Sequence, residues 1–265
     1  MGHRGRSALS GLAAVLAVAA VAFVVRGALQ SDQRPPGAGL PAFHRDTVTN
    51  YYASKAGQNV APSHSSIVAT SRKAKVWVYA HPAQAEKGRR LIKQRVFNRQ
   101  RIPLTFLVQS RRKGWVHVNL PTRPNRSKGW VHRTDVDFAF TRYEVVISLK
   151  HHRLALREGG RTVLRRPIGV GKALSPTPKG TYFVTDVVRT KDPKGFYGPY
   201  ALGLSAHSPV YTTFEGGDGQ VGIHGTSEPQ AIGSDVSHGC IRVRNDVISL
   251  LAHRVPLGTP VDIRA

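Results

Sequence analysis

The chain has 265 residues, of which 40% are hydrophobic and 20% charged, a balance typical of a folded globular protein rather than a disordered one. Its single cysteine excludes an internal disulfide, so the fold depends on packing alone. The formal net charge of +24 favours contact with a polyanion such as nucleic acid, anionic lipid or an acidic wall polymer. Charge alone does not choose among these partners.

The first apolar segment, residues 8–25, is uncharged and follows Arg4 and Arg6. As a helix this segment rises about 27 Å, close to the thickness of a bilayer's hydrocarbon core. The basic flank predicts that residues 1–26 are a cytoplasmic stub and a transmembrane signal-anchor, with the rest of the chain outside the cell. A signal peptide cleaved near 18–20 is the alternative. We expect a single-pass cell-membrane protein or a secreted one, and either location argues against nucleic acid as the partner.

Residues 27–73 contain Pro35-Pro36-Gly37 and little apolar periodicity, which predicts a flexible linker. From 74 to 137, alternations such as "KVWVYAHP" and "PLTFLVQS" predict the short strands of a small barrel. The phrase Lys-Gly-Trp-Val-His occurs twice here, fifteen residues apart. The stretch "PLTFLVQSRRKGWVHVNLPTRPNRSKGWVH" resembles the bacterial SH3-like domains that precede wall enzymes.

Most of the charge lies in this middle part, where residues 67–140 carry 17 basic and 3 acidic side chains. We interpret Arg111-Arg112-Lys113 as a solvated loop, with attraction to an anionic wall polymer as the alternative. Trp115 and Trp130 are predicted to be core or half-buried anchors rather than ligand-stacking platforms.

Residues 141–265 are predicted to form a β-rich domain with one helix, so the whole chain is expected to be mainly β. The stretch "RLALREGGRTVLRR" predicts a hairpin in which Gly159-Gly160 supplies the turn with positive φ. Residues 245–255 predict the helix, with Asn245 as its N-cap. Val247, Ile248, Leu251 and Val255 share its apolar stripe.

The only cysteine, Cys240, lies in Ser237-His238-Gly239-Cys240, sixteen residues after His224. A free thiol is mostly protonated at neutral pH, and a nearby imidazole can remove its proton to give a nucleophilic thiolate. Glycine permits a turn that aims backbone N–H groups at a developing oxyanion. The cluster therefore predicts acyl transfer through a thioester, with His224 and His238 both open as the base.

The stretch "VGIHGTSEPQAIGSDVSHGCIRVRNDVISLL" is similar to the signature of the L,D-transpeptidase catalytic domain family. The resemblance extends over 141–265 and includes "GVGKALSPTPKGTYFVTD" and "YGPYALGLSAHS". It implies that Cys240 is the acylated nucleophile. It also implies that His224 is the general base, oriented by the backbone carbonyl of Gly225.

The same resemblance implies roles for the residues around the nucleophile. Ser237, His238 and the amides of Gly239 and Cys240 are expected to shape the site and its oxyanion pocket. Arg242 is expected to brace the loop or to bind a substrate carboxylate. His207 is a candidate for lining the substrate cleft, although a structural role is an equal alternative.

The implied reaction is the cross-linking of peptidoglycan stem peptides, which serve as donor and acceptor. Cys240 attacks the third residue of a tetrapeptide stem and releases D-alanine, and an amine of a second stem resolves the thioester. A carbapenem is expected to acylate the same cysteine. We expect no cofactor and no metal, because no set of cysteine and histidine residues has the spacing of a closed zinc site.

Two other functions remain open at this stage. Water in place of the acceptor amine would make the protein an L,D-carboxypeptidase that hydrolyses the same bond. A wall-binding protein with a vestigial catalytic domain would instead depend on the basic residues 67–140.

Overall fold

The computed structural model describes residues 62–82, 88–97, 100–214 and 216–265, all within one compact unit. The predicted signal-anchor, residues 1–26, and the greater part of the predicted linker lie outside these ranges. Within the ranges, no helix is both long enough and apolar enough to span a membrane.

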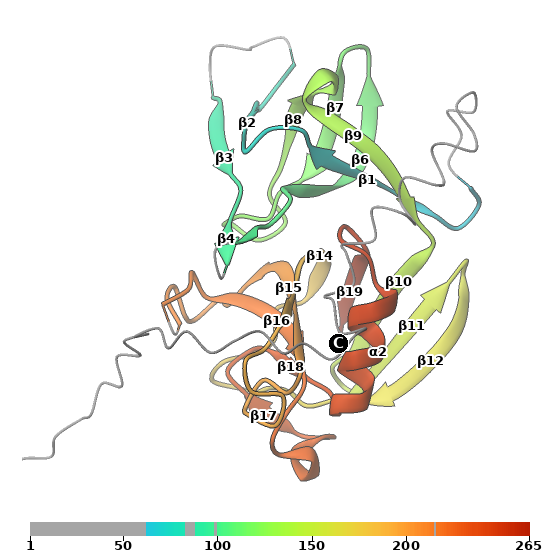
Figure 1. Ribbon diagram of the computed structural model, residues 1–265, viewed down its shortest axis with the longest axis vertical. Coiled ribbons are helices and arrows are strands. Elements are labelled where there is room, and N and C mark those ends of the chain that lie inside the picture. The colour runs from blue at the N-terminus through green and yellow to red at the C-terminus, as the bar shows by residue number, and fades with distance from the viewer. Residues whose placement is uncertain (1–61, 83–87, 98–99, 215) are drawn as a thin grey trace, which may run out of the picture. The chain divides into compact units, whose positions relative to one another are not determined.

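The first part, residues 62–141, is here called the N-terminal β-domain. Its main sheet is antiparallel, in the order β8-β7-β6-β1-β9 (Figure 1). An isolated bridge between Tyr79 and Trp130 ties the end of the β2–β3 ribbon to this sheet. The strands predicted in 74–137 are confirmed, while the SH3-like resemblance stays a prediction. The elements are β1 (Ser66–Ser71), β2 (Lys75–Val78), β3 (Arg90–Lys93), β4 (Val96–Phe97), β5 (Gln100–Arg101), β6 (Thr105–Arg112), β7 (Trp115–Asn119), β8 (Lys128–His132), η1 (Arg133–Asp135) and β9 (Val136–Thr141).

The predicted boundary of the linker at residue 73 is wrong, because β1 lies inside 27–73 and forms part of the main sheet. It pairs with β6 on one side and with β9 on the other, and Val68 and Ala69 are buried. The strand is only six residues long. A run this short beside a proline- and glycine-containing stretch gives too little alternation to be recognised, and distant strands complete its hydrogen bonding.

The repeated Trp-Val-His phrase becomes two adjacent antiparallel strands. In their register Trp115 pairs with His132, Val116 with Val131, and His117 with Trp130. The Trp115 and His132 ring centroids are 3.9 Å apart, and those of His117 and Trp130 are 4.6 Å apart. Each tryptophan is thus covered by the other copy's histidine, and Trp130 is 8% exposed, as expected of core anchors.

The second part, residues 142–265, contains a mixed eight-stranded sheet in the order β12-β11-β10-β19-β14-β15-β16-β18 (Figure 1). Its pairs are antiparallel except for β10 with β19 and β16 with β18. A short parallel pair, β13 with β17, lies beside it. The elements are β10 (Tyr143–Ser148), β11 (Arg153–Glu158), β12 (Arg161–Pro167), β13 (Val170–Gly171), β14 (Gly180–Arg189), β15 (Tyr200–His207), β16 (Gln220–His224), η2 (Pro229–Ala231), β17 (Asp235–Ser237), β18 (Ile241–Arg242), α2 (Asn245–Arg254) and β19 (Pro260–Arg264).

The predicted hairpin is confirmed as β11 and β12. Gly159 and Gly160 join the strands with φ angles of 57° and 83°. Positive φ at both central residues is the geometry that matches the natural twist of a two-residue hairpin, and glycine reaches it without steric cost.

The predicted helix is confirmed as α2, the only α-helix among the described residues. Its apolar stripe is buried in the core of the second sheet, and Ile248 and Leu251 are fully inaccessible. The prediction that Asn245 is the N-cap is wrong: the cap position is Arg244, and Asn245 is the first helical residue. The side chain of Asn245 instead accepts a hydrogen bond from the amide of Thr226, 2.8 Å away.

Candidate active site

His224 is the last residue of β16 and lies next to the strand that follows Cys240. β16 and β18 are parallel, and their register pairs Ile223 with Ile241 and His224 with Arg242. Two segments that are sixteen residues apart in sequence are therefore adjacent in the sheet. The pairing of β16 with β18 therefore brings the predicted base close to the strand that follows the predicted nucleophile.

His224 is 2% exposed, and its ring is held by a hydrogen bond from Nδ1 to the carbonyl oxygen of Gly225, 2.6 Å away. The pKa of His224 is lowered to about 4, mainly by burial and to a lesser extent by the positive charge of Arg242, against the opposing effect of the Gly225 hydrogen bond. The imidazole is therefore neutral at physiological pH. Because Nδ1 carries the proton that Gly225 accepts, Nε2 has the free lone pair that a general base needs.

Two aromatic side chains cover the His224 ring. Tyr197 meets it edge to face with centroids 4.9 Å apart, and Phe196 lies 5.8 Å away. Both come from the loop before β15. These rings contribute to the burial of the imidazole at the end of β16.

The Ser237–Cys240 turn is closed by the Ser237 hydroxyl. Its Oγ donates to the carbonyl oxygen of Cys240 at 2.5 Å and accepts from the amide of Gly239 at 3.1 Å. Gly239 has φ of 120°, a region that residues with a Cβ rarely adopt, while no atom lies within 3.4 Å of where its Cβ would be. Conformation, and not space, therefore demands glycine here. The amide of Gly239 is engaged with Ser237, and the oxyanion role of these residues stays a prediction.

The turn rests on the "GVGKALSP" segment, which carries β13. The amide of Lys172 and the hydroxyl of Ser175 both donate to the carbonyl oxygen of Ser237, at 3.0 and 3.2 Å. A Cβ on Gly171 would lie 2.4 Å from the carbonyl oxygen of Ser175, so the support is too tightly packed for any side chain. The "GVGKALSP" segment therefore holds the Ser237–Cys240 turn in place through hydrogen bonds to Ser237.

Arg242 is 4% exposed and braces the spacer between His224 and the turn. Its Nη1 is 2.9 Å from a carboxylate oxygen of Glu228, and its guanidinium lies 4.5 Å from the centre of the Phe196 ring. Of the two roles predicted for Arg242, these contacts support bracing. Binding of a substrate carboxylate stays a prediction.

Asn245 is a site residue that the sequence interpretation misplaced. Its Oδ1 holds the amide of Thr226, and a Cβ on Gly225 or on Gly198 would approach this oxygen to 2.3 or 2.4 Å. The chain around His224 is therefore packed directly against the start of α2. A polar residue at the first turn of a helix is read as a cap unless its tertiary partner is known, so the sequence held no signal for this contact.

His238 and His207 have opposite environments. His238 is exposed, and its ring centroid is 5.8 Å from those of both Tyr211 and Phe214. His207 is 3% exposed, and its Nε2 is 3.2 Å from a carboxylate oxygen of Asp218. Burial outweighs the attraction of Asp218 and lowers the pKa of His207. These contacts support the structural alternative for His207.

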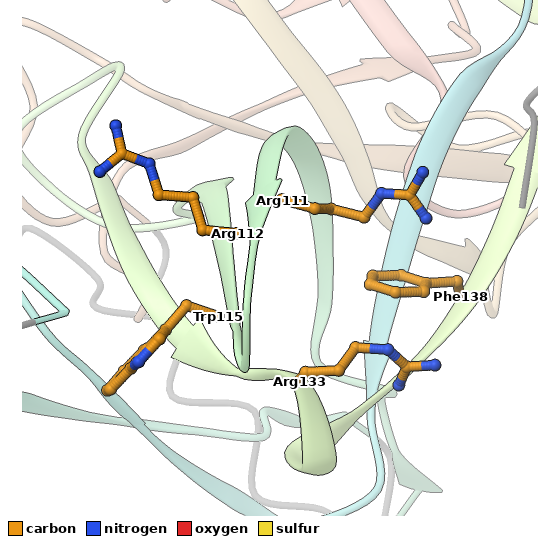
Figure 2. Close-up of a pocket in the computed structure, with 5 residues that line it drawn as sticks. All are labelled: Arg111, Arg112, Trp115, Arg133 and Phe138. Carbon is orange, nitrogen blue, oxygen red and sulfur yellow. The ribbon is translucent and has the colours of Figure 1, made fainter.

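A shallow basic pocket of about 400 Å³ lies on the N-terminal β-domain. In Figure 2 the guanidinium groups of Arg111 and Arg133 lie on opposite sides of the Phe138 ring, at 5.5 and 4.3 Å from its centre. Arg112 and Trp115 complete the lining. Arg111 and Arg112, predicted to lie in a solvated loop, are instead the last residues of β6, and only Lys113 lies in the turn after it; all three are exposed. No potential metal-binding group of three histidine, cysteine or carboxylate residues occurs among the residues that the structure describes.

Sequence comparison identifies the family of the second part of the chain. A model of the L,D-transpeptidase catalytic domain, the YkuD family, matches residues 142–263. A putative L,D-transpeptidase YkuD of Bacillus licheniformis is 40% identical over 121 residues, covering 46% of this chain and 65% of that protein. A putative L,D-transpeptidase YqjB of Bacillus subtilis is 31% identical over 124 residues, covering 44% of this chain and 68% of that protein. The chain belongs to the L,D-transpeptidase catalytic domain family.

Two solved structures are similar to part of this chain. An L,D-transpeptidase from Mycobacterium smegmatis is 17% identical with a TM-score of 0.39, covering 61% of this chain and 90% of that one. The L,D-transpeptidase LdtMt1, solved in complex with imipenem, is 18% identical with a TM-score of 0.37, covering 56% of this chain and 89% of that one.

The conformation of Gly239 gives the first testable prediction. The substitution Gly239→Ala should lower the rate of Cys240 acylation roughly five- to thirtyfold, because a Cβ at this φ costs roughly 1 to 2 kcal/mol and displaces the turn that carries the thiol. Gly233→Ala is the matched control: Gly233 has φ of 102°, in open space in the same spacer. Mass spectrometry of the acylated protein measures both rates. Equal losses in the two variants would mean that general strain of the spacer, and not the turn at Cys240, limits the reaction.

Proposed function

We propose that the protein is an exported L,D-transpeptidase that cross-links peptidoglycan stem peptides through a thioester on Cys240. The single observation that carries the proposal is the neutral, buried His224, whose Nδ1 is fixed by Gly225 and which ends the strand beside the one that follows Cys240. An imidazole held in one tautomer, at the end of a strand that pairs with the one following the only cysteine, suits nucleophilic acyl transfer.

In the first step, His224 Nε2 takes the proton of the Cys240 thiol, and the sulfur attacks the carbonyl carbon of the third stem residue. The C–S bond forms as the carbonyl becomes an oxyanion, for which the amide of Cys240 is the proposed donor. Collapse of this intermediate breaks the bond to the terminal D-alanine. The imidazolium returns the proton to the leaving amine, so D-alanine departs neutral at nitrogen and the imidazole is neutral again.

In the second step, the side-chain amine of a neighbouring stem attacks the thioester carbonyl. His224 takes a proton from this amine, an amide bond forms, and the C–S bond breaks. The sulfur leaves as thiolate and recovers its proton from the imidazolium, which restores the starting state. Water in the acceptor's place would give hydrolysis and an L,D-carboxypeptidase, so the two activities differ only in what reaches the thioester.

Incubation of the full-length chain with a defined stem tetrapeptide tests this proposal. We expect loss of D-alanine and a covalently linked peptide dimer in the product masses. A shortened monomer alone would identify the carboxypeptidase. Cys240→Ala should abolish both D-alanine release and covalent capture of a carbapenem, because no other thiol is present. Capture that survived in this variant would contradict the assignment of the nucleophile.

The buried state of His224 predicts an unusual pH profile. The base must be neutral, and the pKa of His224 is about 4, so the rate of Cys240 acylation should persist as the pH falls below 6 and should decline only near pH 4. The measurement is the rate of carbapenem capture between pH 3.5 and 8, a range chosen to bracket both values. A decline centred well above this value of about 4 would contradict His224 as the base.

The pocket of the N-terminal β-domain supports a second element of the proposal, attraction to the anionic polymer of the wall. Guanidinium groups bind phosphate and carboxylate groups, and three of them, from Arg111, Arg112 and Arg133, line the pocket. The two described acidic side chains of this domain, Asp135 and Asp137, are paired with Lys73 and Arg72. Neither carboxylate lines the pocket, so the positive charge of the pocket's arginines is not neutralised by an acidic side chain in its lining.

Binding to isolated wall sacculi tests this attraction. The double substitution Arg112→Gln with Arg133→Gln should weaken binding severalfold and reduce its sensitivity to salt, because exposed charges act through a field that salt screens. Arg161→Gln, which removes an exposed charge from β12 in the other sheet, is the control. Sacculi stripped of their anionic polymer should bind all variants equally weakly. Undiminished binding by the double variant to intact sacculi would exclude the pocket.

A further inference from the structure

The connection between β15 and β16 lies against the catalytic turn. Its described residues are 208–214 and 216–219. The rings of Tyr211 and Phe214 each lie 5.8 Å from the ring of His238, which precedes Cys240 by two positions, and 5.7 Å from one another. These two aromatic rings therefore lie beside the turn that carries Cys240.

The connection is closed at its neck by its own residues. The amide of Ser208 donates to the carbonyl oxygen of Gly219 at 2.8 Å, and His207 pairs with Asp218 across the same neck. The hydroxyl of Ser208 also accepts from the amide of Tyr211 at 3.0 Å. These contacts hold the two ends of the connection together.

Arg123, in the β7–β8 loop of the N-terminal β-domain, forms hydrogen bonds with the connection. Its Nη1 donates to the carbonyl oxygen of Ser208 at 3.0 Å. Its Nη2 donates to the carbonyl oxygens of Tyr211 at 2.8 Å and Asp218 at 3.1 Å. One guanidinium thus binds the two arms of the connection, residues 208–214 and 216–219. Its charge strengthens each of these hydrogen bonds.

Asn125, two residues further along the same loop, holds the base of the connection. Its Nδ2 donates to the carbonyl oxygen of His207 at 2.7 Å, and its Oδ1 accepts from the amide of His207 at 2.8 Å. The amide side chain therefore satisfies both backbone groups of one residue, as a neighbouring strand would.

The space around the guanidinium is filled. A Cβ on Gly219, which has φ of 73°, would lie 2.0 Å from the carbonyl oxygen of Tyr211 and 2.9 Å from Nη2 of Arg123. The two arms of the connection are therefore as close as a backbone without a side chain allows. Without the guanidinium, three inward-facing carbonyl oxygens would lack their donor, and the arms would have to separate to reach water.

We propose that Arg123 and Asn125 are positioning residues of the transpeptidase site: they fix the β15–β16 connection so that Tyr211 and Phe214 form a binding wall for the donor stem peptide. The inference rests on the proposed function, because the wall matters only if a stem peptide is the substrate. It gives the N-terminal β-domain a direct part in substrate binding. Neither residue touches the thiol, so the chemistry at Cys240 is left intact.

The experiment compares full-length Arg123→Ala and Asn125→Ala with the parent chain in three measurements. KM for the tetrapeptide in D-alanine release should rise on the order of tenfold, the effect of losing hydrogen bonds to a charged or fully paired group. Alkylation of Cys240 by iodoacetamide, which is too small to need the wall, should keep its rate and pH dependence. Amide hydrogen exchange in peptides that cover 208–214 should become faster. Lys128→Ala, at an exposed position in β8 of the same domain, should change none of the three.

Each outcome decides the proposal. Unchanged KM in both variants, or unchanged exchange over 208–214, would overturn it. Alkylation that slows in step with kcat/KM would also overturn it, because the substitutions would then damage the catalytic turn itself. If Arg123→Ala does not fold, Asn125→Ala tests the same wall through the contact at His207. If the parent chain releases no D-alanine, the proposed function fails, and the exchange measurement still decides whether the loop positions the connection.

Discussion

His224 is held by one hydrogen bond, from Nδ1 to the carbonyl oxygen of Gly225, inside a shell that leaves 2% of the residue exposed. The hydrogen bond raises the pKa of His224 and burial lowers it, and the effect of burial is the larger. The result is a base that stays neutral at physiological pH with its free lone pair at Nε2. If the ring were exposed, its tautomer would be free to change and protons would compete for Nε2 near pH 6.5.

The carbonyl of Gly225 can serve only if the chain after β16 follows one path, and that path is imposed by close packing. Asn245 holds the Thr226 amide, and neither Gly225 nor Gly198 has room for a Cβ beside its Oδ1. Asn245 begins α2, whose buried stripe packs on the same sheet. The orientation of the imidazole therefore depends on the docking of the helix, although the helix contributes no group to the proposed chemistry.

Much of this part of the chain could be predicted because its signals are local. A two-glycine turn between alternating residues determines the β11–β12 hairpin, and the spacing of Ile248 and Leu251 determines the buried face of α2. The proposal of His224 and Cys240 as base and nucleophile rests on resemblance to a family motif whose residues are close in sequence. The true position of Asn245, and the membership of β1 in a sheet, depend on partners far along the chain, for which a single sequence carries no signal.

In the proposed enzyme, acyl transfer depends on residues close together in sequence, whereas substrate binding depends on residues far apart. The groups that perform acyl transfer lie within one stretch, from β16 to β18, and their geometry is set by parallel pairing and by the Ser237 turn. The surface that would receive the stem peptide includes the β15–β16 connection, which is fixed by Arg123, 117 residues upstream of the proposed nucleophile Cys240. A backbone connection whose carbonyl oxygens converge cannot satisfy them internally, so it needs a donor from another element. A preceding domain that supplies this donor can change which peptide is bound while the catalytic turn stays the same.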